Sequence, residues 1–124
     1  MSAPGGHKGF KRLVSALGYS YFGLRACFVS EEAFRQEVFL ALLLIPISFW
    51  IGETSAEKLL LCSSVLLVLI IELLNTAVER AIDRISFEKH ELSKEAKDMG
   101  SAAVLLSLLL AGIVWGVICA DKFL

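Results

Sequence analysis

The stretch that decides the fold is MGSAAVLLSLLLAGIVWGVICA, residues Met99 to Ala120, which runs for 22 residues without a charge. As an α-helix it would cross the roughly 30 Å hydrocarbon core of a bilayer at about 1.5 Å per residue. The whole 124-residue chain has the same character, because 56% of its residues are hydrophobic, only 20% are charged and its mean hydropathy is +0.71. These values exclude a disordered chain and argue against a soluble globule. They predict one all-α membrane domain over residues 1–124.

Two shorter apolar stretches precede this one, so three membrane spans are predicted, at residues 31–52, 59–83 and 94–120. The first contains only 15 consecutive uncharged residues and needs the stems of flanking charged side chains to lengthen it. Ser30 and Ser93 are the predicted N-caps of the first and third spans, because a serine hydroxyl accepts a hydrogen bond from an N–H of the first turn.

The segment before the first span has a different pattern. Residues 1–9 are polar and Gly-rich and are predicted to form a flexible tail, whereas residues 10–29 carry apolar side chains at helical spacing, with basic residues off that face. The apolar positions are Phe10, Leu13, Val14, Leu17, Tyr21, Leu24 and Phe28. This pattern predicts an amphipathic helix on the membrane surface. Gly18 and Gly23 predict a break in it, and Pro46 predicts a kink in the first span.

Basic residues predict the orientation. They gather in the first 30 residues and in the connection between the second and third spans, at Lys8, Lys11, Arg12, Arg25, Arg80, Arg84, Lys89, Lys94 and Lys97. The opposite ends of the spans have only Lys58 and Lys122. The positive-inside rule therefore predicts a multi-pass protein with its N-terminus in the cytoplasm.

Two classes of partner and site are disfavoured by composition. A net charge of −1, from 12 basic and 13 acidic residues, gives no general field for nucleic acid. Three cysteines lie scattered in apolar stretches, an odd number without the spacing of a zinc site or a disulfide framework.

The second span contains a polar stripe. Glu72, Asn75, Glu79 and Asp83 fall within about 80° of arc on a helix. With the predicted orientation, Glu79 lies near the cytoplasmic surface and Glu72 lies about 10 Å deeper. A carboxylate at that depth costs a few kcal/mol unless it is partnered or protonated, which suits a general base or a proton carrier. The alternative is a polar contact that holds two helices together.

Further charged residues are predicted at the same cytoplasmic level. Glu31 and Glu32 open the first span, and Lys97 and Asp98 stand at the entrance of the third. Carboxylates hold Mg²⁺ and a lysine contacts phosphate, so this combination is typical of a metal–phosphate site. Each residue also has an ordinary structural reading, as a solvated first turn or a lysine anchored at the membrane surface. The chain has no GxxxxGK[ST] loop and none of the motifs of soluble protein kinases.

Taken together, these motifs resemble the signature of the bacterial integral-membrane diacylglycerol kinases. The likeness covers nearly the whole chain and rests on ELLNTAVERAIDR at 72–84, GYS at 18–20, GLRA at 23–26, AFRQE at 33–37, HELS at 90–93 and AKDMGSAA at 96–103. The resemblance implies a kinase of the bacterial inner membrane that transfers the γ-phosphoryl group of MgATP to the hydroxyl of diacylglycerol, giving phosphatidic acid in phospholipid metabolism. It implies a homotrimeric helical bundle, each subunit with one surface helix and three spans.

The resemblance also implies roles for individual residues. Glu72 would be the general base, Glu31 and Glu79 would hold Mg²⁺, and Asn75 and Asp83 would support them. ATP would be bound by Arg12, Tyr19, Glu31, Glu79, Glu88, Lys89, His90, Lys97 and Asp98. The lipid substrate would be bound by Arg12, Ala33, Phe34, Arg35, Gln36, Glu37, Glu72 and Ser101. Lys89 stands where the family's pattern has an aromatic residue.

Two alternative functions remain at this stage. Undecaprenol kinases share much of the pattern, although the match of the first-span entrance favours diacylglycerol. A small ion-coupled transporter could also use a carboxylate within the membrane as a proton relay. A transporter needs ionisable groups with a path to both sides, and the outer half of each predicted span lacks charge, which favours a site open to one side.

Overall fold

The computed structural model describes residues 8–85 and 90–124, which form helices α1 (Phe10–Ser30), α2 (Glu32–Ile51), α3 (Ser55–Ile85) and α4 (Glu91–Phe123). The described residues contain no strand, so the all-α prediction is confirmed. By length and composition α2, α3 and α4 are each able to cross a membrane. Glu88 and Lys89, two predicted ATP-binding residues, lie outside the described residues.

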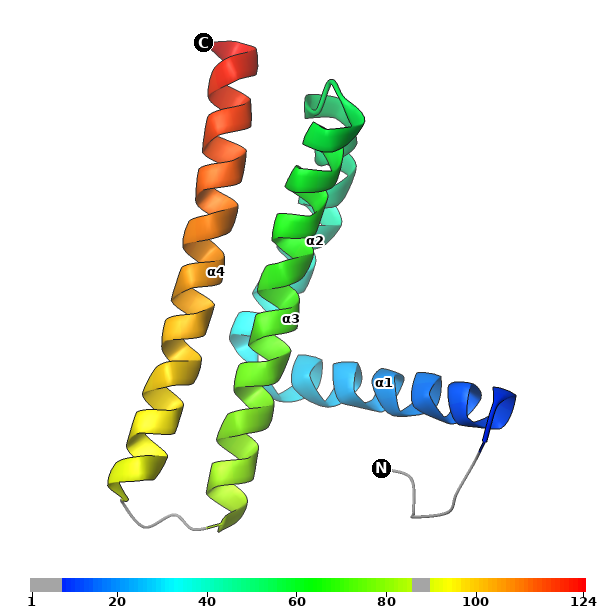
Figure 1. Ribbon diagram of the computed structural model, residues 1–124, viewed down its shortest axis with the longest axis vertical. Coiled ribbons are helices and arrows are strands. Elements are labelled where there is room, and N and C mark those ends of the chain that lie inside the picture. Colours follow the sequence, from blue (N-terminus) through cyan, green and yellow to red (C-terminus); the bar gives the residue numbers. More distant parts are fainter. Residues whose placement is uncertain (1–7, 86–89) are drawn as a thin grey trace.

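Helix α3 is the centre of the subunit (Figure 1). Helices α2 and α4 pack along it, and α1 leaves the bundle nearly at right angles and contacts both α2 and α3. A small core of Ile51, Leu61 and Ile118 closes the end of the bundle far from α1. There the indole N–H of Trp115 donates to the Leu61 carbonyl oxygen at 3.2 Å, which fixes α4 against α3.

Three predictions about where helices break or begin were wrong. Helix α1 continues through Gly18 and Gly23 without a break, because its neighbours support a helix and a single glycine costs only about 1 kcal/mol. Ser30 ends α1 instead of capping α2, and its hydroxyl donates to the Ala26 carbonyl oxygen at 2.9 Å. The N-cap of α4 is His90 and not Ser93, since the His90 Nδ1 accepts from the Leu92 N–H at 3.1 Å.

The outward faces of the spans are apolar and exposed. In the most apolar 18-residue stretch of α4, only 11% is buried within the subunit, compared with 33% in the corresponding stretch of α3. Exposed leucines such as Leu105, Leu106 and Leu109 follow the length of α4. Hydrocarbon tails or other protein copies must cover such surfaces, because water would not solvate them favourably. The exposure pattern therefore agrees with a multi-pass membrane protein.

Candidate active site

Two carboxyl groups meet inside the bundle, between α2 and α3. Glu72 of α3 is only 9% exposed, and its carboxyl lies beside that of Glu37 from α2. Among the described residues, Glu37 Oε2 is buried without a hydrogen-bond partner. Glu37 also borders a small cavity of about 80 Å³, whose other lining residues, including Leu44, Val68 and Leu108, are apolar. One member of the acidic pair, Glu37, thus borders a hydrocarbon-lined space.

Two further acids, Glu31 and Glu79, lie close enough to Glu72 for their charges to act on it. Glu31 is the single residue between α1 and α2, and Glu79 lies two turns beyond Glu72 on α3. The negative charges of both act on the Glu72 carboxyl, so the three acids form one electrostatic cluster. Glu31 and Glu79 therefore lie near Glu72 within one subunit, and their joint role in one site stays a prediction.

Asn75 holds Glu79 in place. Its Nδ2 donates to Glu79 Oε1 at 3.1 Å, one helical turn along α3. Its Oδ1 is buried without a partner in the described part of the chain and rests directly against Gly100 of α4. A Cβ at position 100 would overlap that oxygen, so the absence of a side chain at Gly100 lets α4 approach the Asn75–Glu79 pair.

Replacing Gly100 by alanine is expected to disturb this pair. The new methyl group must displace the Asn75 amide, at a cost of about 1–3 kcal/mol, typical of overpacking, and the hydrogen bond to Glu79 is lost. We expect lower activity at limiting metal concentration together with reduced thermal stability in detergent. Gly116→Ala is the matched control on α4, because a Cβ there meets nothing within 4 Å in the subunit. Equal activity of both variants would contradict the role assigned to this contact.

Lysines at the entrance of α4 are paired with acids. Lys97 Nζ lies 2.8 Å from Asp83 Oδ1 across the α3–α4 interface, and both side chains are about two-fifths exposed. Lys94 Nζ lies 2.8 Å from Asp98 Oδ2 on the same helix. Lys97 thus stands at the rim of the bundle, where it remains accessible to a phosphate, and Asp83 positions it.

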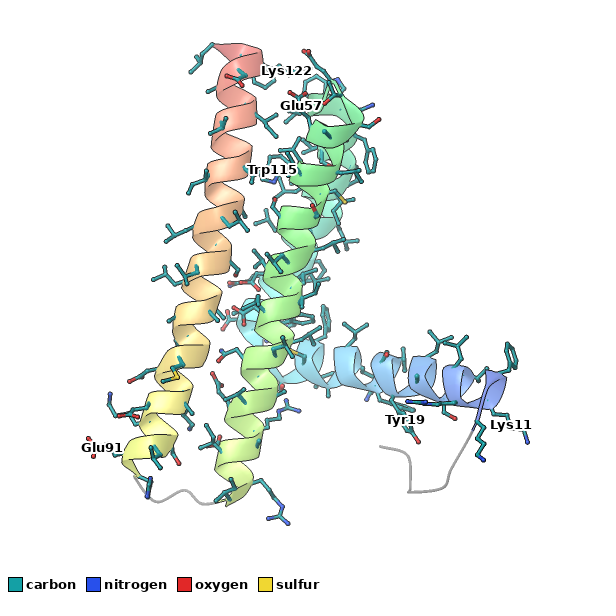
Figure 2. The ribbon with its side chains drawn as sticks, in the orientation of Figure 1. Lys11, Tyr19, Glu57, Glu91, Trp115 and Lys122 are labelled. Carbon is teal, nitrogen blue, oxygen red and sulfur yellow. The ribbon has the colours of Figure 1, made fainter. Side chains whose placement is uncertain are left out.

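The predicted nucleotide-binding residues on α1 stand apart from the acidic cluster. Arg12 and Tyr19 are exposed, and α1 carries them away from its own bundle (Figures 1 and 2). Figure 2 shows Lys11 and Tyr19 on the side of α1 that faces the Glu91 end of the molecule. One subunit therefore does not bring Arg12 and Tyr19 to Glu72.

The predicted lipid-binding residues differ in their exposure to the surroundings of the subunit. Ala33, Gln36 and Ser101 are exposed, whereas Phe34 is only 2% exposed. Phe34 therefore packs inside the subunit, and its contact with the lipid stays a prediction. The guanidinium of Arg35 is also occupied, since Nη1 donates to the Phe28 and Val29 carbonyl oxygens at 2.8 and 2.9 Å.

The donor chemistry fits a small divalent cation. Glu31 and Glu79 offer only carboxylate oxygens, which are the ligands that Mg²⁺ prefers. The part of the chain that the structure describes contains no group of three or more metal-binding side chains.

Two features of the site were missed by sequence reasoning. The Glu37–Glu72 pair was not predicted, although both acids lie at the edge of or within apolar runs, a signal that could have paired them. The contact of Arg80 with Ser30 was also missed, and no sequence pattern predicts it because the two residues are 50 positions apart.

The fold and the site together define a class: an integral membrane protein whose acidic cluster lies where three apolar helices meet a helix that runs across them. Residues 18–119 match the family described as prokaryotic diacylglycerol kinase. A diacylglycerol kinase of Haemophilus influenzae is 54% identical over 87% of this chain and 92% of its own length. Those of Escherichia coli K12 and Pseudomonas aeruginosa are 49% and 47% identical, over 93% and 91% of this chain and 94% and 92% of theirs. The chain belongs to the prokaryotic diacylglycerol kinase family and is a lipid kinase of the inner membrane.

Proposed function

We propose that the protein transfers the γ-phosphoryl group of MgATP to the free hydroxyl of diacylglycerol, giving phosphatidic acid and ADP. Family membership makes diacylglycerol the lipid substrate. The observation that carries the mechanism is the burial of Glu72 beside Glu37, within the field of Glu31 and Glu79. A lipid hydroxyl reaches this level from the membrane, and a nucleotide reaches it from water.

Glu72 is the general base in this proposal. Its carboxylate takes the proton of the lipid hydroxyl as that oxygen attacks the γ-phosphorus and the bond from that phosphorus to the ADP oxygen breaks. Phosphoryl transfer needs little covalent help from the protein, so catalysis rests on alignment and on neutralising charge. Glu37 borders the apolar cavity and orients the glycerol end of the lipid toward Glu72.

Glu31 and Glu79 would hold Mg²⁺, with Asn75 fixing the Glu79 carboxylate. The ion, when bound, neutralises the charge of the ATP phosphates. Lys97 contacts phosphate from the α4 side with Asp98 beside it, and Asp83 holds Lys97 until the nucleotide arrives.

The remaining nucleotide contacts come from a neighbouring subunit in a homotrimer. Arg12 and Tyr19 bind the nucleotide in this proposal, together with the segment 88–90. Helix α1 directs both residues away from their own acidic cluster, which supports a site completed between subunits. The exposed apolar surface of α4 offers area for such packing.

The N-terminus and the α3–α4 connection face the cytoplasm, where ATP is available. This orientation is supported by the basic residues at that end of the molecule. In this orientation Glu31, Glu72 and Glu79 lie in the half of the bundle that is nearer the cytoplasm.

A lipid phosphorylation assay tests the function. Purified protein in detergent, given MgATP and short-chain diacylglycerol, is expected to form phosphatidic acid, and undecaprenol offered in competition is expected to be phosphorylated more slowly. A preference for undecaprenol would reassign the lipid. Absence of any lipid phosphorylation, with ion flux in proteoliposomes, would support the transporter alternative.

A further inference from the structure

The C-terminal end of α1 is held by side chains from two other helices. A helix leaves its last four carbonyl oxygens without partners inside the helix. In α1 the Cys27 oxygen accepts from the Glu31 N–H at 2.9 Å, and the Phe28 and Val29 oxygens accept from Arg35 of α2. The Ala26 oxygen lies one position before these last four, and together with the Ser30 side chain it is on the side of α1 that faces α3.

Arg80 of α3 contacts that remaining part of the helix end. Its Nη2 donates to Ser30 Oγ and lies 3.5 Å from the Ala26 oxygen, while Ser30 Oγ itself donates to the same oxygen at 2.9 Å. Arg80 therefore crosses from α3 to the last turn of α1. Because a guanidinium carries five fixed donors and a full charge, its hydrogen bonds to a helix C-terminus are favourable.

A second contact joins the same two helix faces one turn away. Cys27 Sγ donates to Thr76 Oγ1 at 3.6 Å, and Thr76 and Cys27 are both buried. Burial raises the pKa of the Cys27 thiol, so it remains a protonated donor at neutral pH. Thr76 and Arg80 are four residues apart on α3, and Cys27 and Ser30 are three apart on α1, so the two contacts lie side by side.

These contacts are adjacent in sequence to the two proposed metal ligands. Ser30 precedes Glu31, the only residue between α1 and α2, and Arg80 follows Glu79. The link between Ser30 and Arg80 therefore joins the chain next to Glu31 with the chain next to Glu79.

We propose that Arg80 is a positioning residue, which holds the corner between α1 and α2 against α3 and so sets the spacing of Glu31 and Glu79. The proposal rests on the assignment of these two acids as the metal site. Arg80 acts through Ser30 and not by touching the nucleotide. Losing the link should therefore weaken the use of metal while leaving the proton transfer at Glu72 intact.

The test compares Arg80→Ala, Ser30→Ala and the double variant with the native protein. We measure the Mg²⁺ concentration for half-maximal activity at saturating diacylglycerol, together with kcat and the KM for diacylglycerol. Each single variant is expected to raise the Mg²⁺ requirement by roughly three- to tenfold, the net worth of one ordinary hydrogen bond at an exposed position. The double variant is expected to match the worse single variant, because both remove the same link. The kcat at high Mg²⁺ and the KM for diacylglycerol are expected to change less than about twofold.

Arg84→Ala is the control, because it removes the same charge from the same helix one turn farther on and is expected to leave the Mg²⁺ requirement unchanged. A large effect of Arg80→Ala with none of Ser30→Ala would overturn the proposal and indicate direct nucleotide contact. An unchanged Mg²⁺ requirement in both single variants, or an equal effect of Arg84→Ala, would also overturn it. Failure of the proposed function is distinguishable, because the native protein would then show no metal-dependent lipid phosphorylation.

Discussion

Replacing Glu72 by glutamine is expected to lower kcat by about 10²–10⁴-fold, the usual worth of a general base. Glutamine has nearly the shape of glutamate and still fits beside Glu37, so the variant should fold and insert normally. The amide cannot accept the proton of the lipid hydroxyl, which is why turnover falls. The measurement is phosphatidic acid formation by purified protein at saturating MgATP and diacylglycerol.

Glu53→Gln is the matched control, because this exposed acid lies in the α2–α3 connection, far from the site. It should keep native turnover. Thermal unfolding and the elution volume in detergent are expected to be native-like for both variants. Normal turnover of Glu72→Gln, combined with a clear loss of stability, would instead identify Glu72 as a polar contact that only joins helices.

Replacing Glu79 by glutamine is expected to raise the Mg²⁺ requirement on the order of tenfold or more, because one anionic ligand becomes neutral. The hydrogen bond with Asn75 survives, since the side-chain oxygen of the introduced glutamine still accepts from Asn75 Nδ2. The variant therefore removes the charge and retains the geometry. Activity measured over a series of Mg²⁺ concentrations, at fixed free ATP, gives the shift.

A comparison with Gly100→Ala separates charge from position at this ligand. Gly100→Ala leaves the Glu79 charge but displaces Asn75. The Mg²⁺ requirement of this variant should therefore rise less than that of Glu79→Gln. If Glu79→Gln shows the same magnesium dependence as the native protein, Glu79 is ruled out as a metal ligand. The acid would then serve only to shape the field around Glu72.

The sequence was sufficient to predict the three spans and the common face of Glu72 and Glu79 on the second of them. Long uncharged runs specify membrane helices because unpaired backbone groups cannot remain in hydrocarbon, and this constraint leaves few alternatives. Glu72 and Glu79 are seven residues apart on one helix, so their common face follows from helical geometry alone. Glu31 could be placed near them because it opens the first span at the same level.

Contacts between helices could not be predicted in the same way. Three features depend on which helix faces meet and how closely: the contact of Asn75 with Gly100, the link from Arg80 to Ser30 and the burial of Phe34. Local propensity carries no information on these distances. The predicted caps failed for a related reason: Ser30 and Ser93 are favourable N-cap residues by type, but the chain path places Glu31 and His90 at these positions.

The central place of α3 has a consequence for how sequences of this kind can diverge. Helix α3 contacts each of the other three helices, whereas much of α4 faces outward. A library of single substitutions, selected for growth that depends on the enzyme, should therefore tolerate exchanges among aliphatic residues along the outer side of α4. At the buried positions of α3, such as Leu61, Val65 and Val68, it should retain few replacements, since a change of volume there displaces a neighbouring helix.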